Sequence, residues 1–364
     1  MKKLISVLKL DCRYFRGDVP CTPHKRYGVH CVDARRHVCR YYDKVDKRIL
    51  IIKLGAIGDV IRTTPLLRKL KKEYKKAEIW WITLTPEVLP AVVDVPISFT
   101  VQNILVLQSV HFDVAFNLDK DREACALMSV ISADVKKGYT LKDGKCIPSD
   151  RGAEHKYLTG LFDDISKKNR KSYQQEIFEI SGFKFGGEKY IMPQVPDHRW
   201  DLPKNRIVVG LNTGCGGRWT SRLWPDEYWI ELVRRLRRKH YVPLLLGGEQ
   251  EHKKNQAIAR RSQALYFGYF PLSQFMSLVN RCEIIVTAVT MGMHIAIGLQ
   301  KKIVLFNNIF NKNEFELYGR GRILEPDIAC NCYYSPSCPN DCMRSLSVDA
   351  VFDACEQLLK HSKP

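Results

Sequence analysis

Hydrophobic and polar positions along the chain follow two alternating patterns. Short runs of β-branched and other apolar residues are typical of buried parallel strands, and segments with apolar residues every three or four positions are typical of amphipathic helices. The first pair is a strand over 48–54 and a helix over 60–76, separated by a tight turn. The pattern predicts further strands over 78–83, 103–107, 112–118, 206–211, 242–246, 283–287 and 302–306. It predicts further helices over 123–131, 173–181, 226–239, 251–262, 272–280, 293–299 and 348–359.

Three segments interrupt this alternation. Residues 1–47 have no clear period, 140–170 is polar and is predicted to be loop with little helix, and Pro193, Pro196 and Pro203 mark a linker. Strands and helices alternate on both sides of the linker, which predicts an α/β protein with two doubly wound parallel domains facing a cleft. Ligands of such sheets bind outside the carboxyl ends of the strands, so the cleft is the expected site. The expected parts are an N-terminal extension, two domains and a closing helix, over 1–47, 48–195, 204–346 and 347–364.

Composition and charge narrow the class of protein. The chain has 364 residues, 45% hydrophobic and 27% charged, so it can bury a sizeable core and is neither disordered nor fibrous. No apolar run reaches the roughly 18 residues of a membrane-spanning helix. The first residues lack a signal-peptide cleavage site, so we expect a cytoplasmic protein. The net charge of +19 favours an anionic partner, but no aromatic–basic motif predicts nucleic-acid binding.

Most of the 13 cysteines fall into two sets, one at each end of the chain. Dense thiolates suit zinc, iron or an iron–sulfur cluster, so we expect a structural metal at the C-terminal set, with free thiols as the alternative. This set comprises Cys330, Cys332, Cys338 and Cys342. The second set is more widely spaced, matches no zinc-finger template and comprises Cys12, Cys21, Cys31 and Cys39. It is the weaker candidate for a metal site, and the two sets could also share one site.

Three turns that follow predicted strands carry candidate chemistry. The first, over 53–59, has neither the pattern of a phosphate loop nor G-x-G-x-x-G, and it brings Asp59 to a helix N-terminus. Asp59 there is either a cap of the helix or a general base. The second is a Gly-rich loop over 212–225 whose arginines and backbone N–H groups suit a diphosphate. The third, over 287–299, opens a helix that carries His294.

The order and spacing of these segments resemble glycosyltransferase family 9, the ADP-heptose:lipopolysaccharide heptosyltransferase-like family. The resemblance rests on K-x-G-x-x-G-D-x-x-x-x-T-P-L at 53–66, S-R-L-W-P-D-E-Y-W at 221–229 and T-M-G-M-H-I-A-I-G-L at 290–299. It extends over roughly 48–359. It implies a GT-B fold of two Rossmann-like domains, here with a Cys-rich N-terminal extension, an inverting transfer and no catalytic metal.

The resemblance also implies roles for individual residues. Asp59 would deprotonate the acceptor hydroxyl, and Arg222 would neutralise the leaving diphosphate. Donor binding would fall to Thr213, Gly214, Glu249, Glu251, Phe270, Thr290, Met291, Gly292 and His294. Among these, Glu251 would hold the donor ribose with Glu249 as its close competitor, and Phe270 would flank the base. Val289 stands where the family often has an aspartate that grips sugar hydroxyls, which leaves the donor sugar open.

The function that the resemblance implies is transfer of heptose or a related sugar from a nucleotide-diphosphate donor, with an ADP-sugar favoured. The acceptor would be lipopolysaccharide-like or another surface glycan, an anionic glycan or glycolipid, and contact with the inner-membrane surface is left open. One alternative is a protein acceptor, since the autotransporter branch of the family also carries a C-terminal iron-binding cysteine finger of different spacing. The other is a metal-containing nucleotide-sugar-binding protein without catalysis, against which the retained Asp59 and Arg222 speak.

Overall fold

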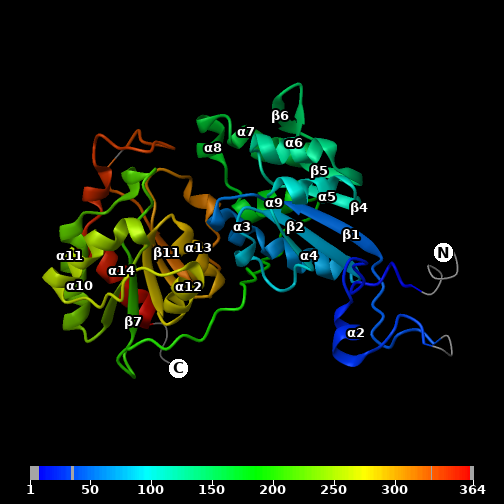
Figure 1. Cartoon of the computed structure of the whole chain (residues 1–364). Coiled ribbons are helices and arrows are strands. Elements are labelled where there is room, and N and C mark those ends of the chain that lie inside the picture. Colours follow the sequence, from blue (N-terminus) through cyan, green and yellow to red (C-terminus); the bar gives the residue numbers. More distant parts are fainter. Residues whose placement is uncertain (1–7, 34–36, 329, 361–364) are drawn as a thin grey trace. The chain divides into compact units, whose positions relative to one another are not determined.

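The chain divides into two compact units, each built on one sheet (Figure 1). The computed structural model describes residues 8–33, 37–328 and 330–360. The first unit comprises Met1–Leu54, Leu67–Pro86 and Val92–Ser149. The second comprises Gly55–Leu66, Glu87–Ala91 and Asp150–Pro364, so the turn after the first strand packs with the second unit. In the described part of the chain no helix is long and apolar enough to cross a membrane.

The first unit has a six-stranded sheet in the order β3-β2-β1-β4-β5-β6. Its neighbouring strands run parallel except for the last pair, which is an antiparallel hairpin. The strands are β1 (Lys47–Ile52), β2 (Ala77–Thr83), β3 (Val95–Ser98), β4 (His111–Asn117), β5 (Ser132–Lys142) and β6 (Lys145–Pro148). The helices are α2 (Thr22–Tyr27), α4 (Pro65–Glu73), α5 (Val101–Gln108) and α6 (Arg122–Val130). Apolar side chains of β1 and β4 pack with those of α5 and α6 to form its core.

The second unit has a five-stranded parallel sheet in the order β11-β10-β9-β7-β8. Its strands are β7 (Val208–Asn212), β8 (Val242–Leu246), β9 (Ile284–Ala288), β10 (Lys302–Phe306) and β11 (Gly321–Leu324). Every residue of β7, β8 and β9 is buried, because a parallel sheet is covered on both faces.

Helices of two kinds belong to the second unit. The α-helices are α3 (Ile57–Thr63), α7 (Glu154–Thr159), α8 (Asp163–Lys168), α9 (Tyr173–Ile180), α10 (Asp226–Arg238), α11 (His252–Ser262), α12 (Leu272–Asn280), α13 (Met291–Gly298) and α14 (Val348–Lys360). Short 3-10 helices are η1 (Pro86–Val88), η2 (Arg151–Ala153), η3 (Thr220–Arg222), η4 (Glu249–Glu251), η5 (Lys312–Glu314) and η6 (Cys342–Ser345).

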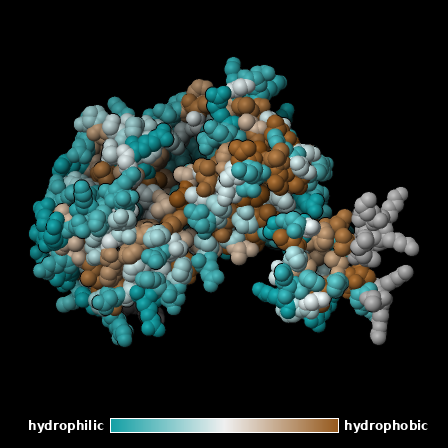
Figure 2. All heavy atoms as spheres, viewed as in Figure 1, coloured by the Kyte–Doolittle hydropathy of each residue, from teal (hydrophilic) through white to brown (hydrophobic). Residues whose placement is uncertain are grey.

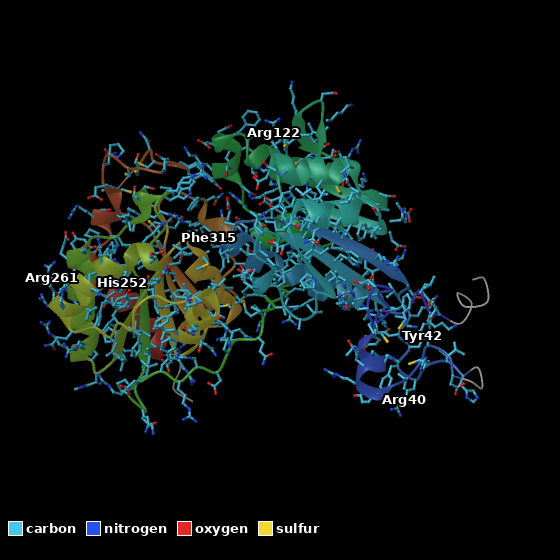
Figure 3. The ribbon with its side chains drawn as sticks, viewed as in Figure 1. Arg40, Tyr42, Arg122, His252, Arg261 and Phe315 are labelled. Carbon is cyan, nitrogen blue, oxygen red and sulfur yellow. The ribbon has the colours of Figure 1, made fainter. Side chains whose placement is uncertain are left out.

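The basic run of α10 is the solvated face of an amphipathic helix. Trp229, Leu232 and Leu236 are buried in the core, while Arg235 pairs with Glu231 at 3.0 Å and also with an aspartate of α14. The surface over α10 and α11 is hydrophilic (Figure 2). Arg261 of α11 and Arg122 of α6 likewise carry their charges at the surface (Figure 3).

The two largely parallel sheets confirm the predicted α/β class, and most predicted elements are present. The strand predicted over 103–107 is wrong, because this segment belongs to α5. The Thr100 hydroxyl accepts from the Asn103 N–H at 3.3 Å and starts a helix whose exposed face is unusually apolar. The helix predicted over 60–76 is two helices, since Pro65 cannot continue α3 and begins α4 instead.

The segment 140–170 is more regular than predicted. It contains the end of β5, all of β6, and helices α7 and α8. The hairpin turns at Asp143 and Gly144, both with positive φ, which is the signature of a tight two-residue connection. The strands of this hairpin are half-exposed and polar, so they lack the apolar run that identified the buried strands. The short strands β3 and β11 were missed for the same lack of signal.

A buried ion pair fixes the end of β1 in the first unit. The Lys53 ammonium lies 2.9 Å from Asp119 Oδ1, and both side chains are almost fully buried. The second oxygen of Asp119 accepts from the Leu54 N–H at 2.8 Å. Removing one charge from such a pair leaves the other charge buried without its partner.

We expect Lys53→Met to lower the free energy of unfolding by about 3–5 kcal/mol, because Asp119 keeps its charge in a buried site. The double variant Lys53→Met/Asp119→Asn should recover most of that loss, since it removes both charges and keeps an acceptor for Leu54. Urea denaturation of the three proteins measures this difference. Equal stability of the single variant and the unmodified protein would contradict it.

Candidate active site

A cavity of about 860 Å³ lies in the second unit, at the carboxyl ends of its central strands. Its walls come from the loops after β7, β8 and β9, from the start of α3, and from the segment between Phe310 and Tyr334. Phe315, labelled in Figure 3, belongs to that last wall. The position agrees with the expectation that parallel sheets bind ligands where their strands end.

Asp59 enters the cavity from the first turn of α3. Ala56, not Asp59, is the N-cap residue, so the reading of Asp59 as the N-cap needs correction. Asp59 occupies the third helical position and its Oδ2 accepts from the Ala56 N–H at 3.2 Å. Its Oδ1 lies 2.7 Å from Arg62 Nη2. The carboxylate therefore caps the helix from inside and is also paired with a cation.

Arg62 is the buried counter-charge of this site. Its guanidinium lies 3.5 Å from the centroid of the Tyr173 ring. Burial would lower the pKa of Arg62, but the adjacent carboxylate of Asp59 raises it above its ordinary value. Glu314 adds a second carboxylate to the cavity wall and accepts from the Tyr334 hydroxyl at 3.3 Å. This side of the cavity thus brings the carboxylates of Asp59 and Glu314 together with the guanidinium of Arg62.

His294 joins α13 to α3 at the closest approach of these helices. A Cβ at Gly58 would lie 2.6 Å from His294 Cδ2, so a side chain at position 58 would force the helices apart. Nδ1 of His294 lies 3.4 Å from the Tyr190 hydroxyl. Burial, helped by the charge of Arg62, lowers the pKa of His294 to about 3. The imidazole is therefore neutral at physiological pH.

A hydrogen-bonded cluster holds the turn before α13. Thr290 is the N-cap of that helix, and Asn212 Nδ2 donates both to its hydroxyl at 3.0 Å and to the Thr287 hydroxyl at 2.8 Å. Gly292 lies against the Asn212 side chain. The N-terminus of α13, with Thr290, Met291 and Gly292, opens into the cavity.

Arg222 lines the cavity from η3 and is braced by backbone carbonyls. Its Nη2 donates to the Cys215 carbonyl at 2.8 Å, its Nε donates to the Trp219 carbonyl at 3.4 Å, and its Nη1 donates to the Val289 carbonyl. Burial lowers the pKa of Arg222. These bonds link the Gly-rich loop to the turn before α13 through one side chain.

Of the other predicted donor-binding residues, the structure places all but one in the wall of the cavity. Gly214, Glu249, Glu251 and Phe270 line the cavity. Glu251 Oε2 accepts from the Gly248 N–H at 2.9 Å, and its side chain packs so closely on Gly214 that no Cβ would fit there. Thr213 is not part of the lining, because it is buried behind the loop and donates to Asn255 Oδ1 at 2.5 Å.

Sequence reasoning missed several residues of this cavity, above all Arg62 and Glu314. Arg62 follows Asp59 by three positions, a spacing that places two side chains on one helix face, and this signal could have identified it. Glu314 lies outside the segments that carry the sequence motifs, so only the fold brings it to the site.

The C-terminal cysteine set forms a compact group of thiols. The sulfur atoms of Cys330, Cys332 and Cys338 all lie within 4.8 Å of one another and could hold a metal ion. In the described part of the chain, no other group of three or more potential ligands is this close. Cys342 is buried and its sulfur accepts from Asn308 Nδ2 at 3.4 Å.

The loop of these cysteines is joined to η3 by hydrogen bonds. The Ser221 N–H donates to the Pro336 carbonyl at 3.0 Å, and the Ser221 hydroxyl donates to the Ser335 carbonyl at 2.8 Å. Asn308 Nδ2 donates to the Ser221 carbonyl at 2.7 Å. Because Arg222 is the next residue, order in the cysteine loop supports the position of that guanidinium.

The depressed pKa of His294 predicts a specific pH dependence of stability. Unfolding exposes the imidazole and returns its pKa to about 6.5, so between pH 6.5 and 3 the unfolded chain binds the additional proton. The contribution of His294 is therefore complete above pH 6.5 and falls by roughly 1.4 kcal/mol per pH unit below it. Denaturant titrations at pH 7 and pH 5 should show a smaller difference in His294→Gln than in the unmodified protein. His198→Gln, at an exposed histidine, should leave the difference unchanged.

Comparisons with known proteins agree with this geometry. Residues 172–316 match the family model described as glycosyltransferase family 9 (heptosyltransferase). Among solved structures, a family 9 glycosyl transferase from Veillonella parvula is similar at a TM-score of 0.67 and 19% identity, over 87% of this chain and 98% of that one. ADP-heptose lps heptosyltransferase II of E. coli is similar at a TM-score of 0.62 and 16% identity, over 87% and 100% of the two chains.

A third similar structure contains a metal. The iron-containing dodecameric glycosyltransferase TibC of enterotoxigenic E. coli has a TM-score of 0.54 and 12% identity, over 88% of this chain and 78% of that one. No curated protein matches the sequence. These structural likenesses establish a shared fold. Residues 172–316 match glycosyltransferase family 9, which confirms the resemblance seen in the sequence over this segment and supports glycosyltransferase activity.

Proposed function

We propose that the chain is an inverting glycosyltransferase that uses a nucleotide-diphosphate sugar, with an ADP-sugar favoured. The observation that carries this proposal is that one cavity combines Asp59 with Arg222 and the N-terminus of α13. An acid, a guanidinium and a helix N-terminus are what transfer from a diphosphate requires: a proton acceptor and stabilisation of a leaving anion. The similar E. coli structures named for ADP-heptose support the choice of nucleotide.

The donor would bind with its diphosphate at the N-terminus of α13. Backbone N–H groups and the helix dipole favour an anion there, beside the hydroxyl of Thr290. Each of the three hydrogen bonds of Arg222 uses one N–H on a different nitrogen. A guanidinium carries five N–H groups, so a second one on each Nη can reach the diphosphate. Glu251 would hold the ribose and Phe270 would flank the base.

In the transfer itself, the acceptor oxygen attacks the anomeric carbon while the bond from that carbon to the diphosphate oxygen breaks. The acceptor proton moves to Asp59, and the electron pair of the broken bond leaves on the diphosphate, which Arg222 stabilises. Attack from the side opposite the leaving group inverts the anomeric centre. Arg62 keeps Asp59 ionised before the transfer, because its charge lies 2.7 Å away.

The acceptor that we favour is an anionic glycan or glycolipid of the cell surface, glycosylated at the inner face of the cytoplasmic membrane. The net charge of +19 supports an anionic acceptor. A protein acceptor is the alternative, supported by the iron-containing TibC structure and by the cysteine loop. The donor sugar that we propose is heptose or a related sugar, although Val289 has no carboxylate with which to grip its hydroxyls. Incubation with nucleotide sugars and each class of acceptor, followed by mass spectrometry, distinguishes these acceptors from a binding protein without catalysis.

We infer that Cys330, Cys332, Cys338 and Cys342 hold a structural metal, iron or zinc. Their loop is tied to η3 through Ser221 and lies behind the cavity wall, so the ion orders the donor loop without entering the reaction. Thiolate sites of this kind stabilise short loops because metal binding is coupled to folding.

Asp59→Asn should reduce turnover by about 100- to 10,000-fold, because it removes the proton acceptor. The amide oxygen can still accept from the Ala56 N–H, so donor binding should change little, whereas the melting temperature should fall because Arg62 loses a carboxylate that offsets its burial. Rates of sugar transfer and donor affinity measure both effects.

Glu314→Gln is the matched control for this experiment, since Glu314 is a buried carboxylate of the same cavity wall. It should retain most of its turnover. Loss of turnover in Glu314→Gln with near-normal turnover in Asp59→Asn would assign the base to Glu314.

Arg222→Ala should weaken binding of ADP by roughly 10- to 100-fold, the range expected for a hydrogen bond to a charged group. Arg222→Lys should restore part of the affinity. Arg218→Ala changes an exposed arginine of the same loop and should leave the affinity unchanged. Calorimetric titration with ADP compares the three, and equal affinity in Arg222→Ala would remove this residue from the diphosphate site.

Cys338→Ser should lose the metal of the C-terminal set and melt at a lower temperature, because one thiolate ligand is missing. Elemental analysis of anaerobically purified protein and thermal melting measure the two changes. Full metal content in this variant would show that Cys338 is not a ligand.

A further inference from the structure

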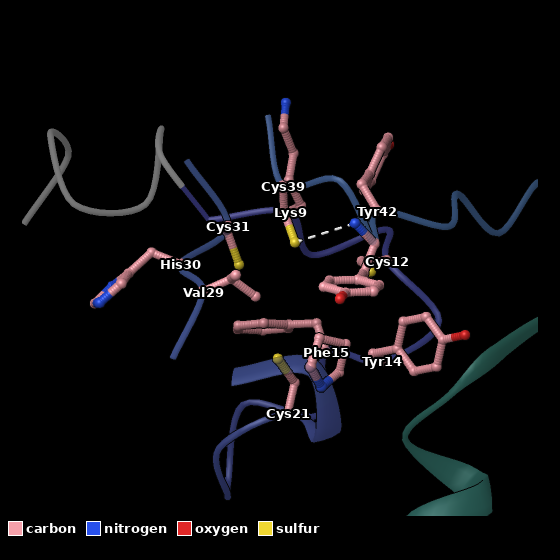
Figure 4. Close-up of a pocket in the computed structure, with 12 residues that line it drawn as sticks. Lys9, Cys12, Tyr14, Phe15, Cys21, Val29, His30, Cys31, Cys39 and Tyr42 are labelled. Carbon is pink, nitrogen blue, oxygen red and sulfur yellow. Dashed lines mark hydrogen bonds between the residues drawn. The ribbon is translucent and has the colours of Figure 1, made fainter. Parts of the chain in front are cut away.

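The extension before β1 has its own group of four cysteines, and they converge on one small pocket. Cys12, Cys21, Cys31 and Cys39 all line it, together with aromatic side chains such as Phe15 and Tyr42 (Figure 4). The four cysteines come from positions spread over 28 residues of the chain. All four are half-buried and free of disulfide bonds.

The backbone fixes each of these cysteines. The carbonyls of Cys12 and Cys39 each accept from the N–H three residues later, at 2.9 Å, and the Cys21 carbonyl accepts from the Lys25 N–H at 3.0 Å. The Cys39 N–H donates to the Cys31 carbonyl at 2.9 Å. Val32 and Val38 form an antiparallel bridge, so Cys31 and Cys39 lie directly opposite each other next to it. Two turns, the start of α2 and an antiparallel pairing therefore deliver the four thiols to one place.

Hydrogen-bond donors and cations lie around these thiols. The Tyr41 N–H donates to the Cys39 sulfur at 3.4 Å, the dashed line in Figure 4. Lys9 lines the same pocket, and Arg40 lies above the Tyr41 ring with its guanidinium carbon 4.8 Å from the ring centroid. Figure 3 labels Arg40 and Tyr42 of this N-terminal extension.

The extension lacks a core that could hold these turns. Of its described residues, 8–33 and 37–46, Pro23 alone is buried, and α2 has only six residues. Segments of this size that bury so little apolar surface generally need a disulfide or a metal ion for order. The described arrangement has four convergent free thiols, so a metal ion is the source of order that fits it.

We propose that Cys12, Cys21, Cys31 and Cys39 form a structural site for one thiophilic metal ion, Zn²⁺ or Fe²⁺, separate from the C-terminal set. Four thiolates are a complete ligand set for either ion. Binding forms four metal–sulfur bonds and releases the four thiol protons to solvent, which leaves a site of net charge −2 beside Lys9. The ion would draw the thiols closer together than they lie without it.

The test is metal content of the full chain, purified anaerobically and measured for zinc and iron by elemental analysis. Cys21→Ser and Cys31→Ser should each lose about one equivalent of metal per chain and keep the equivalent of the C-terminal set. Cys338→Ser should show the reverse. Cys146→Ser, at a half-buried thiol of the same unit outside both sets, should keep all the metal. Which element disappears identifies the ion.

A second measurement is independent of the metal acquired in the cell. Metal-free protein titrated with Co²⁺ should develop the visible absorption of a tetrahedral thiolate site, and Cys31→Ser should lose that part of the signal even where the chain remains folded. Proteolysis should cut the extension in Cys31→Ser faster than in Cys146→Ser. These readouts do not depend on sugar transfer, so their outcome is independent of the proposed activity.

Three results would overturn the proposal. One is unchanged metal content in both Cys21→Ser and Cys31→Ser. Another is a disulfide between Cys31 and Cys39, found by mass spectrometry of protein that lacks the additional metal. The third is loss of the same single equivalent in Cys31→Ser and Cys338→Ser, which would mean that the two sets share one ion.

Discussion

The contact between Gly58 and His294 is the constraint on which the candidate active site depends. It lets α3 approach α13 so closely that α3, the helix after β1, belongs to the second unit. Asp59 and Arg62 thereby share a cavity with the loops that follow β7, β8 and β9. A larger residue at position 58 would separate the acid from the diphosphate-binding elements, although it would touch neither.

Charge in this cavity is arranged by burial and pairing. Arg62 remains a cation because Asp59 offsets the cost of its burial, while burial and the charge of Arg62 together hold His294 neutral. Arg222 is surrounded by carbonyl oxygens, which orient the guanidinium without neutralising it. The outcome is one mobile proton site beside two fixed positive charges, an arrangement that suits a reaction in which a proton is accepted and an anion leaves.

Sequence patterns predicted those elements whose structure is determined by a short stretch of the chain. Buried parallel strands such as β1 and β7 were identified by their apolar runs, and the donor loops by Gly and hydroxyl residues after strands. The error at α5 arose because apolar residues also occupy its exposed face, so its sequence resembles the apolar run of a strand. The segment is nevertheless helical, and the Thr100 hydroxyl caps its N-terminus. Thr213 was assigned to donor binding from its position in the family motif, but its side chain turns inward to Asn255. Glu314 could not be predicted, because its place depends on how distant segments fold together.

The hydrogen bonds from Ser221 to Ser335 and Pro336 connect η3, which lines the cavity, to the loop of the C-terminal cysteines. The cysteine loop carries three sulfur atoms that could hold a metal ion, whereas Arg222, one residue beyond Ser221, lines the cavity. Loosening of the loop would first release η3 and with it the orientation of the guanidinium, long before the sheet itself unfolds. With the proposed metal and donor sites, affinity for the nucleotide would therefore fall when the cysteine loop loses its ion.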